Sequence, residues 1–265
     1  MGCGMFKIAC NWSIELYDLI VSGQVDVDYI KAGAFGDFDS CFEKMRALRP
    51  VLLHGFGHYE KAGMNNIEIV DFERGNRLLA ECGSPHYGLH LCITNADMGT
   101  EIKEEDIHEH MCRNIRIFKK KLNVPLLLEN IPDAPQEKTL YDHFPYSQAD
   151  KISRVIHDND VDLLLDITHA KIACMYRKWN LHDYLSELPL ERVREIHVNG
   201  SGYDKNGFPD DTHNAMEDAD YATLEWVLGR TNPQIVSLEY VGIPSENREL
   251  VSENIKKQLK NIRNL

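Results

Sequence analysis

The sequence alternates eight times between a short apolar run and a longer amphipathic segment. The short runs have the length and side-chain types of β-strands, and the longer segments repeat apolar residues at helical spacing. Strands that alternate with helices favour a parallel sheet covered by helices. Eight such units in 265 residues match the roughly 250 residues of a closed (β/α)8 barrel. The sequence therefore predicts one α/β TIM-barrel domain over residues 1–265.

The expected elements follow from these runs and from the helix start and stop signals around them. We expect strands over 5–10, 25–30, 51–54, 87–93, 124–128, 161–165, 193–198 and 235–239. We expect helices over 14–20, 38–48, 67–80, 104–122, 147–157, 181–188, 221–228 and 247–262. The glycine-rich segment after residue 198 is expected to be a loop that ends in Asp211-Thr212-His213.

Polar side chains lie at or just after the ends of the third to eighth expected strands, and all are His, Asp or Glu. They are His54, His90, Glu129, Asp166, His169, His197, Asp211, His213 and Glu239. In a barrel the carboxyl ends of the strands converge on one face. Each residue alone has a structural explanation; Asp166-x-x-His169, for example, is typical of a helix-capping turn. Carboxylates and imidazoles buried together, however, are costly unless a cation compensates them, so the pattern predicts a metal site.

Nine ligands exceed what one ion needs, because zinc takes about four and octahedral metals about six. With one bridging carboxylate, the set fits two or three divalent ions, which we expect to be zinc, iron or manganese. Such a cluster activates bound water and clamps both oxygens of a phosphoester displacement. With iron, the same ligand types leave positions open for dioxygen.

Composition narrows the class of partner and the cellular compartment. The formal net charge of −13 argues against duplex DNA, whose binding depends on basic contacts to phosphates. The seven cysteines are odd in number and form no CxxC, which favours reduced thiols in a cytoplasmic protein. We expect no signal peptide and no membrane span, and the sequence indicates no oligomeric state. The remaining histidines are expected to be solvated: His58, His86, His108, His110, His143, His157 and His182.

The Asp-x-x-His at 166–169 and the Asp-x-His at 211–213 make the sequence resemble the xylose-isomerase-like TIM barrels. Within them it is similar to the endonuclease IV type, which carries nine ligands of these kinds in this chain order. The resemblance implies a first metal held by His54, His90 and Glu129. It implies that Glu129 bridges to a second metal, completed by Asp166, His197 and Glu239. It implies a third metal held by His169, Asp211 and His213.

A second resemblance is to multinuclear non-haem iron oxidative enzymes that modify cysteines in ribosomal peptides. It rests on Leu-Leu-Leu-Glu-Asn at 126–130, Leu-Leu-Leu-Asp at 163–166, and Ile-His-Val-x-Gly followed by Asp-Thr-His. Such enzymes often work with a partner protein and bind a leader peptide. The first expected strand also ends in Ala-Cys-Asn-Trp-Ser, where endonuclease IV has Gly-x-His-x-Ser, which argues against abasic-site cleavage.

The sequence thus leads to a ranked set of functions. We favour metal-assisted hydrolysis of a phosphoester in a small or non-duplex substrate, with Glu129 and Glu239 as the catalytic candidates that hold the metals apart. The alternatives are iron-dependent oxidation of a peptide, sugar isomerisation or epimerisation, and a non-catalytic metal-containing binding module. The substrate is accordingly expected to be a small molecule or a peptide, selected by the loop over 201–209.

Overall fold

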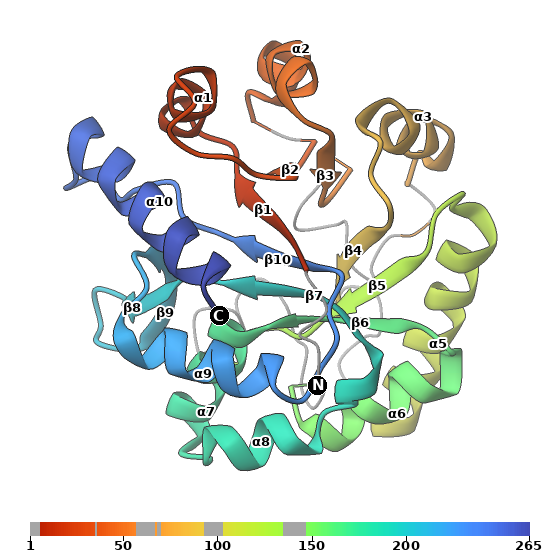
Figure 1. The fold of residues 1–265 in the computed structure, drawn as a ribbon. Helices are drawn as coiled ribbons and strands as arrows, with labels where there is room; N and C mark the ends of the chain where they lie inside the picture. Colours follow the sequence, from red (N-terminus) through yellow and green to blue (C-terminus); the bar gives the residue numbers. More distant parts are fainter. Residues whose placement is uncertain (1–5, 35, 57–66, 68–69, 93–102, 135–146) are drawn as a thin grey trace.

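A computed structural model describes residues 6–34, 36–56, 67, 70–92, 103–134 and 147–265. Its main sheet has eight parallel strands in the order β3-β2-β1-β10-β7-β6-β5-β4. Their bounds are β1 Lys7–Asn11, β2 Tyr29–Ala32, β3 Val51–Leu53, β4 Tyr87–His90, β5 Leu126–Glu129, β6 Asp162–Asp166, β7 Val193–Val198 and β10 Ile235–Leu238. A parallel bridge between His54 and Gly88 joins the two edge strands, so the sheet closes into a ring (Figure 1). The predicted TIM barrel is confirmed.

Helices surround the ring of strands (Figure 1). They are α1 Ile14–Val21, α2 Phe38–Leu48, α3 Phe72–Cys82, α5 Glu104–Lys121, α6 Ala149–Asn159, α7 Ile167–Arg177, α8 Leu181–Glu187, α9 Asp218–Leu228 and α10 Arg248–Arg263. Their ends carry local signals: the Ser13 side chain caps α1 by accepting a hydrogen bond from the backbone of Leu16. No helix in the described part of the chain has both the length and the apolar character that crossing a membrane requires.

The inside of the barrel is apolar at one end and polar at the other. Ala9, Tyr29, Leu52 and Ile235 form a small buried cluster of their own. Side chains two positions further along a strand point to the same face, and Asn11 pairs in register with Lys31 directly beyond Ala9 and Tyr29. The alternation therefore places an apolar layer inside the barrel and polar side chains beyond it, at the carboxyl ends of the strands.

Several predicted boundaries are wrong. The second strand covers Tyr29–Ala32 rather than 25–30, because its register with β1 begins at Tyr29. The third helix begins at Phe72, after the capping Asp71, rather than at 67. Residues 5, 68, 69 and 93 of the predicted elements lie outside the described residues, as do His58 and His143.

The helix α7 was missed by the sequence prediction. It begins immediately after β6, with Asp166 as its N-cap residue, where we expected a strand end and no helix before 181. Its buried side chains, Ile167, Ala170, Ile172 and Ala173 among them, face more than one direction around the helix, so the segment lacks the amphipathic period on which the prediction depended.

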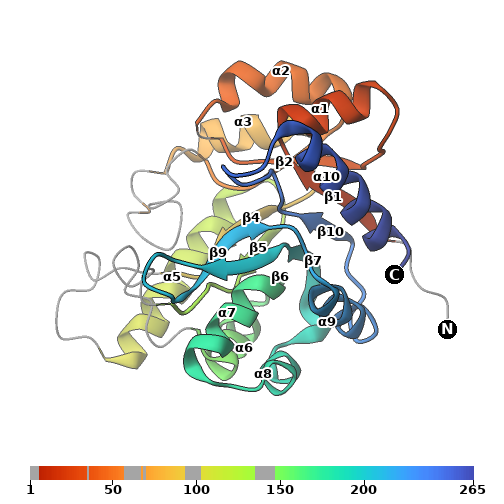
Figure 2. The ribbon, with the colours of Figure 1, turned by 90° about the vertical axis from the view of Figure 1, so that its left-hand side faces the viewer.

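The predicted glycine-rich loop after β7 is a β-hairpin. Strands β8 (Gly200–Tyr203) and β9 (Pro209–Asn214) pair antiparallel and extend beside the barrel mouth (Figure 2). A Cβ at Gly200 would lie 2.3 Å from the backbone oxygen of Ala215, so the glycine permits close pairing here rather than marking a flexible loop.

Candidate metal centre

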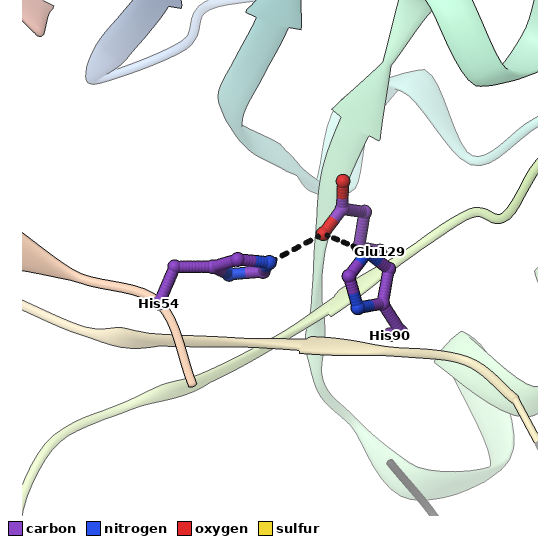
Figure 3. Close-up of side chains that lie close together, drawn as sticks. All are labelled: His54, His90 and Glu129. Carbon is purple, nitrogen blue, oxygen red and sulfur yellow. Dashed lines mark ion pairs between the residues drawn. The ribbon is translucent and has the colours of Figure 1, made fainter. Parts of the chain in front are cut away.

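Glu129, at the end of β5, lies at the centre of the polar cluster. Its side chain is 1% exposed. Its Oε2 lies 3.2 Å from His54 Nε2 and 3.3 Å from His90 Nε2, and both rings point toward it (Figure 3). Its Oε1 lies 3.1 Å from His197 Nδ1 and 3.6 Å from His169 Nδ1. Each carboxylate oxygen thus faces a different pair of imidazoles.

A second group lies on the next strands of the ring. Ligand atoms of Asp166, His197 and Glu239 come within 4.8 Å of one another, as do those of Glu129, Asp166 and His169. His197 Nδ1 is 3.8 Å from Asp166 Oδ2 and 3.6 Å from Glu239 Oε2. The barrel therefore places the predicted second set around one point and keeps it in contact with Glu129.

The third predicted set joins α7 to the hairpin. Asp211 Oδ2 lies 3.2 Å from His169 Nε2 and 3.0 Å from His213 Nε2, while its Oδ1 accepts a 2.7 Å hydrogen bond from the Asn199 side-chain amide. His213 has φ +50°, a left-handed conformation that is uncommon for a residue with a side chain and that often occurs at functional sites. A network of short contacts therefore links all nine predicted residues.

The arrangement fits bound cations. Buried polar atoms normally have hydrogen-bond partners, yet His54 Nδ1, Glu129 Oε2 and Asp166 Oδ2 form no hydrogen bond with any residue that the structure describes. Asp166 has a divided role: its Oδ1 accepts a hydrogen bond from the backbone of His169, and its Oδ2 faces the cluster. The capping role and the ligand role that the sequence left open are thus compatible.

Burial and neighbouring charges set the protonation of the cluster. Burial lowers the pKa of His90 to about 3, which leaves the neutral imidazole that metals bind. Burial alone would raise the pKa of Glu129, but the imidazoles of His90, His197 and His54 outweigh it and hold that pKa well below its usual range. Burial raises the pKa of Asp166 to about 7, and the nearby carboxylates of Glu239 and Asp211 add to the effect.

Lys31 is a site residue that the sequence prediction missed. Its Nζ contacts both ring nitrogens of His197, lies 3.0 Å from Nδ1, and donates a 2.6 Å hydrogen bond to Glu239 Oε1. Burial disfavours its charge, but the carboxylates of Glu239, Glu195 and Glu129 outweigh burial and raise its pKa. The second strand was predicted to end at residue 30, directly before Lys31, whereas β2 extends to Ala32 and includes Lys31.

A buried pair behind His197 was also missed. Glu195 Oε1 accepts hydrogen bonds from His197 Nε2 at 2.9 Å and from the Ser237 hydroxyl at 2.7 Å. Its Oε2 lies 2.6 Å from His86 Nε2. His86 and His108 are 3% and 5% exposed, so the expectation that both are solvated is wrong. The alternation of β7, which turns Glu195 and His197 to the same face, was the available signal.

The cluster forms part of the wall of a cavity of about 390 Å³, within the roughly 300–1,000 Å³ of small-ligand sites. Seven of the candidate ligands line this cavity: His54, His90, Glu129, His169, Asp211, His213 and Glu239. Asn11, Trp12, Phe38 and Val241 form other parts of the lining. A substrate in this cavity would contact the side chains of the candidate metal ligands and also an apolar surface.

Comparison with known proteins identifies the family. The family model described as "RiPP precursor modification enzyme MbnB/TglH/ChrH" matches residues 17–261. The chain belongs to this family. A UPF0276 protein from Caulobacter vibrioides is 24% identical over 204 residues, covering 74% of this chain and 71% of that protein.

Solved structures share the fold at low identity. A putative xylose isomerase from Rhodospirillum rubrum has a TM-score of 0.66 at 14% identity, covering 98% of this chain and 99% of its own. The IOLI protein, solved with a zinc atom, has a TM-score of 0.62 at 12% identity, and the match covers 97% of this chain and 98% of that protein. Endonuclease IV from Thermus thermophilus has a TM-score of 0.59 at 14% identity, and the match covers 98% of this chain and 100% of that protein. Both resemblances inferred from the sequence, to xylose-isomerase-like barrels and to peptide-modifying enzymes, are confirmed.

Proposed function

We propose that this protein is a metal-dependent enzyme that oxidatively modifies a ribosomally synthesised precursor peptide. The observation that carries the proposal is the family match over residues 17–261, which includes all nine candidate ligands. Phosphoester hydrolysis, which we favoured from the sequence, takes second place, because the similarity to endonuclease IV at 14% identity concerns the fold alone.

The nine residues would hold up to three divalent ions. His54, His90 and Glu129 would hold the first, and Glu129 would connect it to a second. Asp166, His197 and Glu239 would complete the second, and His169, Asp211 and His213 would hold the third. We take the ions to be iron, which supplies redox chemistry and open positions for dioxygen when bound to such ligands.

The side chains of this protein would position the ions and the substrate. Glu129 directs one oxygen to His54 and His90 and the other to His197 and His169, so it would take part in holding both of the first two ions. Glu239 lines the cavity, and although burial opposes its charge, His197 and Lys31 lower its pKa to about 2, which keeps it anionic. His169 Nδ1 contacts the backbone oxygen of Asn130 at 2.9 Å, so its Nε2 is directed toward Asp211.

The cavity favours a peptide side chain over a phosphoester. Trp12, Phe38 and Val241 give it an apolar wall. Lys31 is the one Lys or Arg among the described lining residues, and its ammonium already pairs with Glu239. A phosphoester would therefore depend on the metals alone for charge compensation, in a protein of net charge −13, whereas a neutral side chain such as a cysteine thiol would not.

The test starts with metal analysis of anaerobically purified protein. The neighbouring genes are searched for one that encodes a short cysteine-containing peptide. The protein is then incubated with that peptide under air, and mass spectrometry and oxygen uptake are recorded. We expect bound iron, peptide-dependent oxygen uptake and a change in peptide mass. We expect His197→Ala and Asp211→Ala to lower the metal content and abolish both signals, while His182→Ala, an exposed control on α8, leaves them unchanged.

Two outcomes contradict the proposal. Zinc or manganese together with phosphodiester cleavage, and no change in the peptide, would favour hydrolysis. A metal-loaded protein with no turnover on the peptide or on phosphodiesters would favour a binding module. If both substitutions leave the metal content unchanged, the ligand assignment itself is wrong.

A further inference from the structure

Lys31 lies in an unusual place for a lysine. It points from β2 into the barrel and is 3% exposed. A buried ammonium is costly unless opposite charges compensate it, and here Glu239 Oε1 lies 2.6 Å from Nζ. Its other hydrogen-bonding contacts are with His197. The lysine thus contacts two of the three residues that complete the proposed second metal position.

The contact with His197 involves the nitrogen that would bind a metal. His197 Nε2 is 2.9 Å from Glu195 Oε1, so this nitrogen faces the Glu195 carboxylate. Nδ1 faces Glu129 and Asp166 and is the nitrogen that a metal in this position would use. Lys31 Nζ contacts both ring nitrogens of His197 and lies 3.0 Å from this Nδ1.

We propose that Lys31 is a built-in cation that occupies the Asp166–His197–Glu239 position and competes with a metal ion for it. A metal bound to Glu239 and His197 would lie about 2.0–2.2 Å from each ligand atom. An ammonium 2.6 Å from Glu239 Oε1 and 3.0 Å from His197 Nδ1 lies against two of the three residues that this metal would need. The two cations cannot occupy that space together, and their like charges repel.

The proposal predicts an order of metal loading. The first position uses His54 and His90, and the third uses His169, Asp211 and His213, none of which is among the hydrogen-bonding contacts that the structure gives to Lys31. These positions should therefore fill first. The second fills last, at a metal concentration high enough to displace the ammonium, which then moves into the adjoining cavity that it already lines.

Metal stoichiometry tests the competition directly. Full-length wild type and Lys31→Met are titrated with Zn²⁺ alone against a chromophoric chelator. We expect Lys31→Met to bind one more tight equivalent, or its weakest equivalent at least about tenfold more tightly, which corresponds to about 1.4 kcal/mol. Lys256→Met removes a lysine that pairs with Glu253 on α10 and should behave as wild type. Equal or weaker metal binding by Lys31→Met overturns the proposal.

A second measurement needs no variant. Lysines of the wild-type protein are labelled by reductive methylation without metal and after saturation with Zn²⁺, and the peptide that contains Lys31 is quantified. We expect little labelling of Lys31 without metal and a clear increase at saturation. Labelling that stays at the metal-free level when all metal equivalents are bound overturns the proposal, even if Lys31→Met does not fold.

The inference rests on the metal positions of the proposed function but not on its reaction or its substrate. The same wild-type titration separates the two. If wild type binds no Zn²⁺, the proposed function fails at its first step. If it binds Zn²⁺ and neither measurement responds to Lys31, only the competition is wrong.

Discussion

At the scale of single residues, the candidate centre depends on which neighbour each polar atom of a side chain contacts. Glu129 directs one oxygen to His54 and His90 and the other to His197 and His169. A carboxylate at 1% exposure is stable only with such compensation. His197 likewise uses one nitrogen for Glu195 and the other for the cluster. The orientation of the ligands therefore depends on residues that would not touch a metal.

Glu195→Gln tests that dependence. The amide keeps the size of the side chain but cannot accept hydrogen bonds on both sides, so the bond from His197 or the one from His86 is lost. We expect Zn²⁺ affinity to fall by about 10–100-fold, as for other residues that orient metal-binding histidines. The measurement is a Zn²⁺ titration against a chelator, with circular dichroism to confirm the fold.

The control for this variant is Glu187→Gln, an exposed carboxylate on α8 that should leave the titration unchanged. Wild-type Zn²⁺ affinity in a folded Glu195→Gln protein would mean that the His86–Glu195–His197 contacts do not orient the ligand.

At the scale of elements, the seam between β3 and β4 is the most sensitive point of the barrel. The described pairing there is the bridge between His54 and Gly88. A Cβ at Gly88 would lie 2.8 Å from His54 Nδ1 and 2.8 Å from Leu164 Cδ1. Because Gly88 has no side chain, the His54 ring can occupy this space.

Gly88→Ala should therefore displace the His54 ring. We expect the free energy of unfolding to fall by roughly 1–3 kcal/mol, the usual cost of overpacking, and Zn²⁺ binding at the first position to weaken. Urea unfolding and chelator titration measure the two effects. Gly229→Ala is the matched control, because its added Cβ would meet Glu225 O at an ordinary 3.5 Å. Unchanged Zn²⁺ binding by Gly88→Ala would show that the seam adapts without moving His54.

The hairpin β8–β9 carries two candidate ligands, Asp211 and His213, and its turn is held by Asp204. Asp204 Oδ1 accepts hydrogen bonds from the backbone of Asn206 at 2.8 Å and of Phe208 at 2.9 Å. These bonds lower the pKa of Asp204, chiefly through Phe208. The carboxylate thus stabilises the turn from which β9 begins.

We expect Asp204→Ala to speed amide hydrogen exchange in β8 and β9 severalfold and to weaken Zn²⁺ binding at the third position, with the rest of the barrel unaffected. Hydrogen exchange followed by mass spectrometry resolves the hairpin. The neighbouring Lys205→Ala, an exposed change, should have no effect. Equal exchange in the two variants would show that the turn does not need the Asp204 carboxylate.

The sequence predicted the elements that follow simple periods and missed those that do not. Eight strands, and the polar side chains that lie at their ends or in the segments that follow them, could be predicted from alternation and topology. The helix α7 was missed because it is buried on several sides, and the hairpin because its glycines resemble those of a loop. Lys31 and His86 were missed because their roles depend on strand register, which is fixed by pairing with distant strands rather than by local sequence.

At the scale of the whole molecule, the acidic charge and the candidate centre act together. The chain carries a net charge of −13, and several of its carboxylates converge at the mouth of the barrel. Repulsion among exposed charges is screened by ordinary salt, because the Debye length falls to about 8 Å at physiological ionic strength. Buried groups such as Glu129 and Asp166 are screened much less, so they respond to a bound cation rather than to ionic strength.

Metal removal should therefore destabilise the protein in a way that salt cannot restore. At a free ion concentration of about 100 times Kd, binding contributes about 2.7 kcal/mol, which raises Tm by roughly 5–10 °C in a chain of this size. We expect chelation to lower Tm by that amount and Zn²⁺ to restore it, whereas added NaCl shifts the chelated and the loaded protein equally. Asp211→Asn, which removes a ligand charge, should reduce the response to Zn²⁺. If NaCl alone restores Tm after chelation, the stabilising effect comes from the surface charge and not from ions held by the nine residues, because only exposed repulsion is relieved by screening.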